Sequence, residues 1–235
     1  PSMNYTFTYD NARLKKDYQL WWENSITSAG NVTSLLYAAL GKDFSEKNKK
    51  LLGTPFAQFM KFTSEIRTLF KVGEKQHIAA RLMGGVLWSY GNQTIAPYSE
   101  QFYIGGANSL RAFTVRSLGP GTYNPGKNTK YGYLDQTGDI KLEANVEYRF
   151  PIFGELYGAT FLDAGNVWLM RKDESRPGGE LTLKNFAKSI ALNTGVGVRY
   201  DLTFLVIRLD MGIALHVPYE TGKSGYYNIP KFKDG

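Results

Sequence analysis

Strict alternation of apolar and polar residues is the strongest constraint on how this chain folds. In residues 204–217, large apolar side chains occupy every second position, and the positions between them are mostly polar or small. The apolar row is Leu205, Ile207, Leu209, Met211, Ile213, Leu215 and Val217, and the other row is Arg208, Asp210, Gly212, Ala214 and His216. Side chains of a β-strand point to opposite faces in turn, so this pattern predicts a strand with one apolar and one polar face.

The same pattern recurs along the chain and predicts an all-β fold. In residues 139–150 the polar row is Lys141, Glu143, Asn145, Glu147 and Arg149. The segments expected to form strands are 3–10, 18–27, 56–70, 77–90, 139–150, 156–168, 190–202 and 204–217. These strands, about eight in number, predict an antiparallel sheet.

Two environments produce such alternation. A soluble β-barrel points its apolar row inward, whereas a membrane barrel points it outward toward lipid. The expected strands have about 10 to 14 residues, long enough to cross a membrane at a tilt. Their polar rows mix both charge signs with small residues, which is typical of a water-filled lumen. Aromatic residues gather near the strand ends, where interfacial belts form. These residues are Tyr18, Trp22, Trp88, Tyr90, Phe150, Trp168 and Tyr200.

The links between the expected strands alternate in length. Short links lie at 11–17, 71–76, 153–155 and 201–203, and long ones lie at 28–55, 91–138, 169–189 and after residue 217. Outer-membrane barrels have short turns at the periplasmic end and long loops at the outer end. The expected fold is therefore an antiparallel transmembrane β-barrel in the outer membrane of a Gram-negative bacterium.

We expect residues 1–235 to form one domain that is part of a larger barrel. A barrel hides its strand edges from lipid only when its first and last strands pair. Segment 3–10 has no strand before it, and segment 218–235 leads from the last expected strand into a loop. The chain is interpreted as the C-terminal part of a bigger barrel without its final strand, with loop 91–138 folded inward.

Composition excludes several other classes. Mean hydropathy is −0.32, and no run approaches the roughly 20 apolar residues of a membrane helix. The absence of cysteine excludes disulfides, zinc–thiolate sites and thiol nucleophiles within this sequence. The net charge of +7 comes from 28 basic and 21 acidic residues, with local basic clusters at 47–50 and 231–233. These clusters are interpreted as solvated loop tips rather than a nucleic-acid site.

No arrangement of residues predicts catalysis, a metal site or a cofactor. His77 and His216 lie far apart in the sequence and lack metal-ligand spacing. The glycine pair at 84–85 falls inside an expected strand and indicates a bend rather than a phosphate-binding loop. Glu143 and Glu147 could resemble a catalytic carboxylate pair, but four residues along a strand separate them by about 13 Å. We therefore expect no enzyme activity.

Loop 91–138 contains the most informative short motif. Residues 103–113 read Tyr-Ile-Gly-Gly-Ala-Asn-Ser-Leu-Arg-Ala-Phe, and Gly-Pro-Gly follows at 119–121. Gly105 and Gly106 permit backbone conformations closed to other residues, and the Gly-Pro-Gly segment marks a sharp turn. Arg111 lies among these glycines and aromatic residues. The motif favours a loop that folds back into the barrel, where its arginine finds carboxylate partners.

This loop resembles the inward-folded sixth extracellular loop of the BamA/TamA family of outer-membrane insertases and related two-partner secretion pores. The family loop carries a Val-Arg-Gly-Phe/Tyr motif, from which this sequence departs at Leu110 and Ala112. These two departures resemble the variant of Bacteroidetes-type members. The sequence of residues 108–113, Asn-Ser-Leu-Arg-Ala-Phe, resembles the TamA-like branch. Segments 145–151 and 161–168 are similar to the two strands that follow the loop in the family. The resemblance covers residues 76–217, and 1–75 only through strand architecture.

The resemblance implies that acidic residues of these two strands hold the loop arginine inside the barrel. The residues expected to form this loop lock are Arg111, Phe113, Gly105, Gly106, Glu147 and Asp163. If the hairpin turns near 154–155, Asp163 lies directly or diagonally opposite Glu147, and such cross-strand neighbours are about 5 to 8 Å apart. One guanidinium then reaches both carboxylates. The alternative is that Glu147 and Asp163 are hydrated lumenal charges and Arg111 is a solvated loop residue.

The resemblance also implies a function: insertion or export of β-barrel-type client proteins at the outer membrane, without covalent chemistry. The implied partners are outer-membrane lipids, client outer-membrane or secreted proteins, envelope lipoproteins and periplasmic domains of the same full-length protein. No nucleic-acid partner is expected. Two alternatives stay open, a passive outer-membrane pore that the loop constricts and a soluble ligand-binding β-barrel. Recovery in the aqueous fraction without detergent would favour the soluble barrel.

Overall fold

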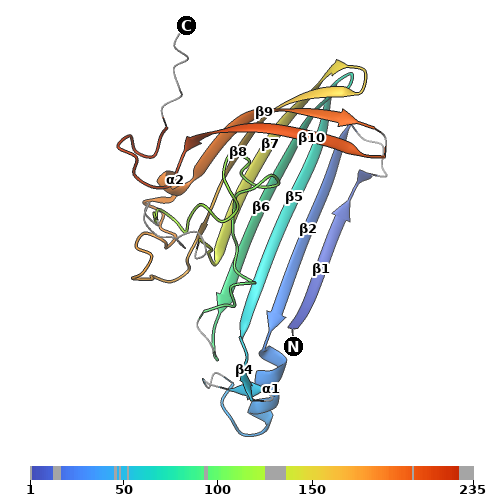
Figure 1. The fold of residues 1–235 in the computed structure, drawn as a ribbon. Helices are drawn as coiled ribbons and strands as arrows, with labels where there is room; N and C mark the ends of the chain where they lie inside the picture. The colour runs from blue at the N-terminus through green and yellow to red at the C-terminus, as the bar shows by residue number, and fades with distance from the viewer. Residues whose placement is uncertain are drawn as a thin grey trace.

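The computed structural model describes residues 2–12, 17–44, 47, 49–51, 53–92, 95–124, 136–202 and 204–227. Its main feature is one curved antiparallel sheet in the order β1-β2-β5-β6-β7-β8-β9-β10 (Figure 1). The strands of this sheet are β1 (Ser2–Asp10), β2 (Tyr18–Ala29), β5 (Phe59–Gly73), β6 (Gln76–Ser89), β7 (Ile140–Phe153), β8 (Leu156–Trp168), β9 (Ala191–Asp201) and β10 (Val206–His216). A separate short pair consists of β3 (Lys50–Leu51) and β4 (Thr54–Pro55). The large sheet is open, with β1 and β10 at its edges.

The eight expected strands are confirmed, and so is the alternation of short and long links. Phe153 pairs with Leu156, so the hairpin between β7 and β8 turns at residues 154–155 as the sequence predicted. Strand ends differ from expectation by a few residues. For example, β7 continues past residue 150 to Phe153, because Pro151 still pairs with Tyr157 across the hairpin.

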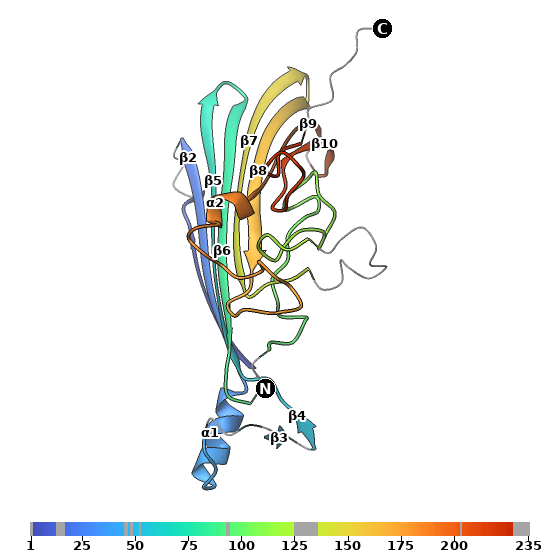
Figure 2. The same cartoon turned by 90° about the vertical axis from the view of Figure 1, so that its left-hand side faces the viewer.

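The apolar rows lie on the outer face of the sheet, which agrees with a membrane barrel. Leu209 and Met211 of β10 are 73% and 71% exposed, and Val146 of β7 is 46% exposed. Glu147, the next residue of β7, is only 6% exposed. The polar rows therefore face the concave side of the sheet, which we call the lumen. The loop between β6 and β7 lies against this concave side (Figure 2).

Two helices within the long links were not predicted, because only strand periodicity was found there. They are α1 (Asn31–Ala39) and α2 (Phe186–Ser189). In α1, Thr33 and Ser34 are buried, and Leu35 and Leu36 are exposed. This helix thus repeats the inverted polarity of the strands. Within the described ranges, no helix has the length and apolar character needed to cross a membrane.

Trp168 does not belong to an interfacial aromatic belt, and that expectation was wrong for this residue. Its side chain is 1% exposed, whereas Trp88 is 51% exposed. The Trp168 ring stacks on Phe186 of α2 with 5.6 Å between ring centroids. Its indole N–H donates to the Ser189 hydroxyl (2.9 Å). The link after β8 therefore folds back over this end of the strand and covers the ring.

The loop between β6 and β7 brings an apolar cluster into the lumen. Ile104, Leu110 and Leu118 of the loop are fully buried, together with Leu87 of β6 and Val167 of β8. Two backbone hydrogen bonds of 2.9 Å between residues 102 and 138 join the two limbs of the loop. The parts of the loop at 93–94 and 125–135 lie outside the described residues. The described part is a folded element with its own apolar core.

Candidate functional site

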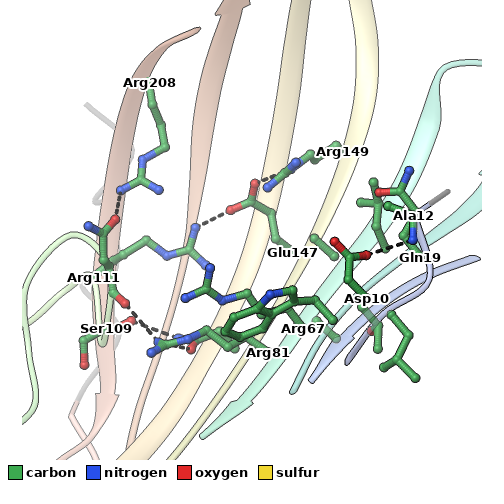
Figure 3. Close-up of a pocket in the computed structure, with 18 of the residues that line it drawn as sticks. Asp10, Ala12, Gln19, Arg67, Arg81, Ser109, Arg111, Glu147, Arg149 and Arg208 are labelled. Atoms are coloured by element: carbon green, nitrogen blue, oxygen red, sulfur yellow. Dashed lines mark hydrogen bonds and ion pairs between the residues drawn. The ribbon is translucent and has the colours of Figure 1, made fainter. Parts of the chain in front are cut away.

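Arg111, near the tip of the loop, contacts both carboxylates that the sequence singled out. Figure 3 shows Arg111 beside one of them, Glu147. Its Nε and Nη2 donate to Asp163 Oδ2 (2.9 Å) and Oδ1 (2.8 Å), which forms a two-point guanidinium–carboxylate pair. Its Nη1 donates to Glu147 Oε2, and its backbone N–H donates to Asp163 Oδ2 (3.2 Å). The guanidinium carbon also lies 3.6 Å from the ring centroid of Phe161. Two carboxylates and one aromatic face therefore hold this side chain.

The register of β7 and β8 explains how both carboxylates reach one guanidinium. Asn145 pairs with Asp163, and Glu147 pairs with Phe161. Asp163 is therefore diagonal to Glu147 on the lumenal face, which is one of the two arrangements that the sequence allowed. Phe161 lies opposite Glu147 and two residues before Asp163 on β8, and it supplies the ring that Arg111 contacts.

Burial makes these charges depend on one another. The side chains of Arg111, Glu147 and Asp163 are 7%, 8% and 0% exposed. Burial opposes the charge on Arg111, but hydrogen bonds to Asp163 and Glu147 outweigh it and raise the guanidinium pKa above its ordinary value. Removal of either partner would leave a buried charge without its counter-ion. Truncation of one of these side chains is therefore expected to lower the free energy of unfolding by about 3–5 kcal/mol.

A wider network of polar side chains surrounds this contact. Arg199 of β9 donates to Glu147 Oε2 (3.0 Å) and lies 2.6 Å from Asp210 Oδ1 of β10. Arg149 Nε donates to Glu147 Oε1 (2.7 Å). The amides of Asn145 and Asn193 each donate to Asp163 at 3.0 Å. Four strands, β7 to β10, therefore meet at the point where the loop docks.

Sequence reasoning did not single out the partners from β9 and β10. Arg199, Asp210 and Asn193 do lie on the polar rows of their strands, so a signal was present. That signal places a residue on the lumenal face but does not say which of several charges it meets. The choice depends on the shear between strands, which only the pairing of β8, β9 and β10 supplies.

A second set of contacts holds the loop tip by its backbone. Ser109 Oγ donates to Glu143 Oε2 (2.6 Å), and Arg81 of β6 donates to the same carboxylate and to the carbonyl of residue 108 (3.1 Å). Asn145 Nδ2 donates to the Ser109 carbonyl (2.9 Å). From β10, Arg208 donates to the Ala107 carbonyl (2.7 Å). Loop carbonyls at 107–109 are therefore satisfied by wall side chains.

The two glycines of the motif shape the loop before its tip. Gly105 and Gly106 have φ of +98° and +93°, a region that L side chains rarely adopt. The Gly106 N–H donates to the Phe113 carbonyl (2.8 Å), which closes the turn. A Cβ on Gly105 would lie 2.1 Å from the Thr114 carbonyl oxygen. Phe113 itself packs against the apolar cluster of the loop.

Small residues in the wall make room for the loop. A Cβ built on Gly212 of β10 would lie 3.1 Å from the Ala112 Cβ, so the alanine that departs from the family motif faces a glycine. A Cβ on Gly85 would lie 2.5 Å from the Phe102 ring. The pair at 84–85, expected to mark a bend, continues the β6 register on both sides, and its second glycine receives this ring.

The structure does not bring the two histidines together. His77 lies at the start of β6, beside a short link, and His216 ends β10, beside a long one. The ring nitrogens of His216 lie 2.6 Å and 3.1 Å from the carbonyls of Ile190 and Ser224. Within the part of the chain that the structure describes, no three His, Cys, Asp or Glu side chains gather in a group that could hold a metal ion.

Known proteins with similar sequences support the resemblance. The chain is 34% identical over 90 residues to "Outer membrane protein assembly factor BamA" of Neisseria meningitidis, which covers 36% of this chain and 11% of the relative. It is 28% identical over 150 residues to "Sorting and assembly machinery component 50 homolog" of Homo sapiens, which covers 61% of this chain and 30% of the relative. The chain thus spans less than a third of these curated relatives.

A solved structure of BamA from Haemophilus ducreyi lacking POTRA domains 1–3 is also similar, with a TM-score of 0.48 and 13% identity. The match covers 91% of this chain and 58% of that one. The model of the Omp85 superfamily domain matches residues 31–227, which is most of this sequence. The chain therefore belongs to the Omp85 superfamily of outer-membrane β-barrel proteins.

Proposed function

We propose that this chain is part of the barrel of an outer-membrane factor that inserts or exports β-barrel-type client proteins. Membership of the Omp85 superfamily supports this, and so do two similar proteins, one named as an outer-membrane protein assembly factor and the other as a sorting and assembly machinery component. The TamA-like branch and the Bacteroidetes-type variant stay predictions from the loop motif.

The contact of Arg111 with Asp163 and Glu147 carries the proposal, because it fixes a long loop inside the lumen. We propose that the loop lock keeps strands β7 to β10 in one arrangement while other parts of the barrel change. A wall stiffened in this way leaves the seam between the first and last strands of the full barrel as the place where a client strand pairs, which is a form of β-augmentation. The outward apolar rows then contact outer-membrane lipids.

The work proposed involves no covalent chemistry. Glu147 and Asp163 are each held by at least one guanidinium, so neither is free to act as a general base. Further proposed partners are client outer-membrane or secreted proteins, envelope lipoproteins and periplasmic domains of the full-length protein.

Depletion of the full-length protein, followed by quantitative proteomics of the outer membrane, tests the proposal. We expect the levels of several other β-barrel proteins to fall together, because an assembly factor limits their insertion. A matched strain that re-expresses the wild-type gene should restore them. If all other barrels keep their levels after depletion, the assembly function is wrong and a passive pore is the better explanation.

A further inference from the structure

A cavity of about 710 Å³ lies between the tip of the loop and the short-link end of the sheet. Both edge strands contribute to its lining, with Asp10 from β1 and Arg208 from β10. Loop residues 107–109 and Arg111 form another wall. Figure 3 shows labelled side chains of all these walls around one space. A segment that enters the lumen from the short-link end therefore reaches this cavity before it reaches the loop tip.

Arginines dominate the walls of the cavity. The lining contains Arg67, Arg81, Arg111, Arg149 and Arg208, and its acidic residues are Asp10 and Glu147. Arg81 and Arg111 already contact buried wall carboxylates. The other three also form ion pairs, Arg67 with Glu65, Arg149 with Glu147 and Arg208 with Asp210. The cavity therefore favours an anionic occupant through guanidinium N–H groups that these carboxylates leave free.

Two of these arginines present an unused edge to the cavity. Arg67 donates through Nε to Glu65 Oε1 (2.6 Å), and Arg149 donates through Nε to Glu147 Oε1 (2.7 Å). Among the described residues, neither pair of Nη atoms has a partner, and the side chains are 58% and 43% exposed. The Arg67 guanidinium carbon also lies 4.6 Å from the centroid of the Trp21 ring. The two free Nη groups of such a guanidinium can donate two parallel hydrogen bonds to one carboxylate.

The spacing of the two arginines indicates what kind of anion fits. On β6, Arg67 is paired with Arg81 and Arg149 is paired with His77, which lie four residues apart. With β6 between the two strands, the two backbones are about 16 Å apart, from strand rise and strand separation. Each guanidinium is hydrogen-bonded to a carboxylate two residues earlier on its own strand. Both side chains therefore lean the same way, and the two guanidinium groups keep about the same separation as the two backbones. No single carboxylate or phosphate spans this distance.

We propose that this cavity binds an extended acidic polypeptide segment, with one carboxylate on Arg67 and a second on Arg149. Residues four or five apart in an extended chain are about 14 to 17 Å apart, which matches the spacing of the arginines. The assignment of the natural occupant to a client segment rests on the proposed function, whereas the binding of acidic peptide does not.

The test uses the purified full-length protein in detergent and a fluorescent ten-residue peptide of alternating glutamate and serine. Fluorescence anisotropy should show binding that the same peptide with glutamine in place of glutamate lacks. The double variant Arg67→Gln/Arg149→Gln should weaken binding about tenfold or more, because two charge-assisted contacts are lost. Arg67→Lys/Arg149→Lys keeps the pairs with Glu65 and Glu147 charged but loses the two-point edge, so it should also bind more weakly.

A matched control removes the same charge elsewhere. Lys184→Gln/Lys188→Gln changes two exposed residues next to and within α2, outside the cavity, and should leave binding within twofold of wild type. Equal loss in this control, or undiminished binding by both arginine variants, would overturn the site. Displacement of the peptide by an equal concentration of inorganic phosphate would overturn the two-carboxylate requirement. Arginine-dependent binding with an unchanged outer-membrane proteome after depletion would overturn the proposed function and leave the site standing.

Discussion

Replacement of Arg111 by alanine is expected to lower the free energy of unfolding by about 3–5 kcal/mol and to release the loop from the lumen. The variant leaves Asp163 with only amide donors among its described side-chain contacts, and Glu147 loses one of three guanidinium partners. Unfolding in denaturant measures the first effect. Because this chain has no cysteine, a single cysteine at Leu118, which is buried in the loop, reports release through maleimide labelling.

Arg116→Ala is the matched control for this prediction. Arg116 lies in the same loop, but its guanidinium stacks on Tyr98 (4.8 Å) and Tyr103 (4.5 Å) rather than on carboxylates. Its loss should cost less and leave the cysteine at Leu118 protected. Equal labelling in the two variants would show that Arg111 does not hold the loop. Higher ion conductance in Arg111→Ala with normal client assembly would favour a pore over an assembly factor.

Gly105→Ala is expected to be the second severe change, because the new Cβ meets backbone rather than a movable side chain. At φ +98° the left-handed conformation alone costs an L residue about 1–3 kcal/mol. The Cβ would also lie 2.1 Å from the Thr114 carbonyl oxygen, so the turn must open. We expect lower stability in denaturant and faster labelling of the cysteine at Leu118.

Gly41→Ala separates these two causes. Gly41 has a similar φ of +85°, but a Cβ there meets nothing within 4 Å. It should show the conformational cost alone and no change in loop labelling. If Gly41→Ala and Gly105→Ala destabilise the protein equally, the close approach to Thr114 does not determine the shape of the loop.

The strands could be predicted because their period is two and their polarity is inverted almost without error. With Phe153 opposite Leu156, strict pairing would set Leu162 opposite Glu147. The register shift between Pro151 and Phe153 sets Phe161 there instead, and so puts Asp163 on the same face as Glu147. The contact with Arg111 then needed only a loop long enough to return. The choice of Arg111, Glu147 and Asp163 as one set came from the resemblance to the family loop, because the pattern alone also allowed hydrated, unpaired charges.

Other features depend on contacts between distant segments. The burial of Trp168 depends on α2, eighteen residues later, and a sequence pattern in β8 shows only a strand-end aromatic residue. Arg199 and Asp210 join the network because of how β9 and β10 shift against β8. Arg67 and Arg149 bound the same cavity although one intervening strand separates them. Periodicity assigns a face to each residue but not its neighbours across the lumen.

The apolar cluster of Ile104, Leu110 and Leu118 has a consequence for how the loop can leave. These side chains lie next to the contacts that Arg111 makes at the loop tip. The tip therefore cannot leave the lumen without exposing apolar surface to water. The ion pairs and the apolar contacts of the loop should therefore be lost together, in one cooperative transition rather than one after another. High salt alone should not release the loop from the lumen, because salt screens buried ion pairs only weakly and does not weaken the hydrophobic contacts.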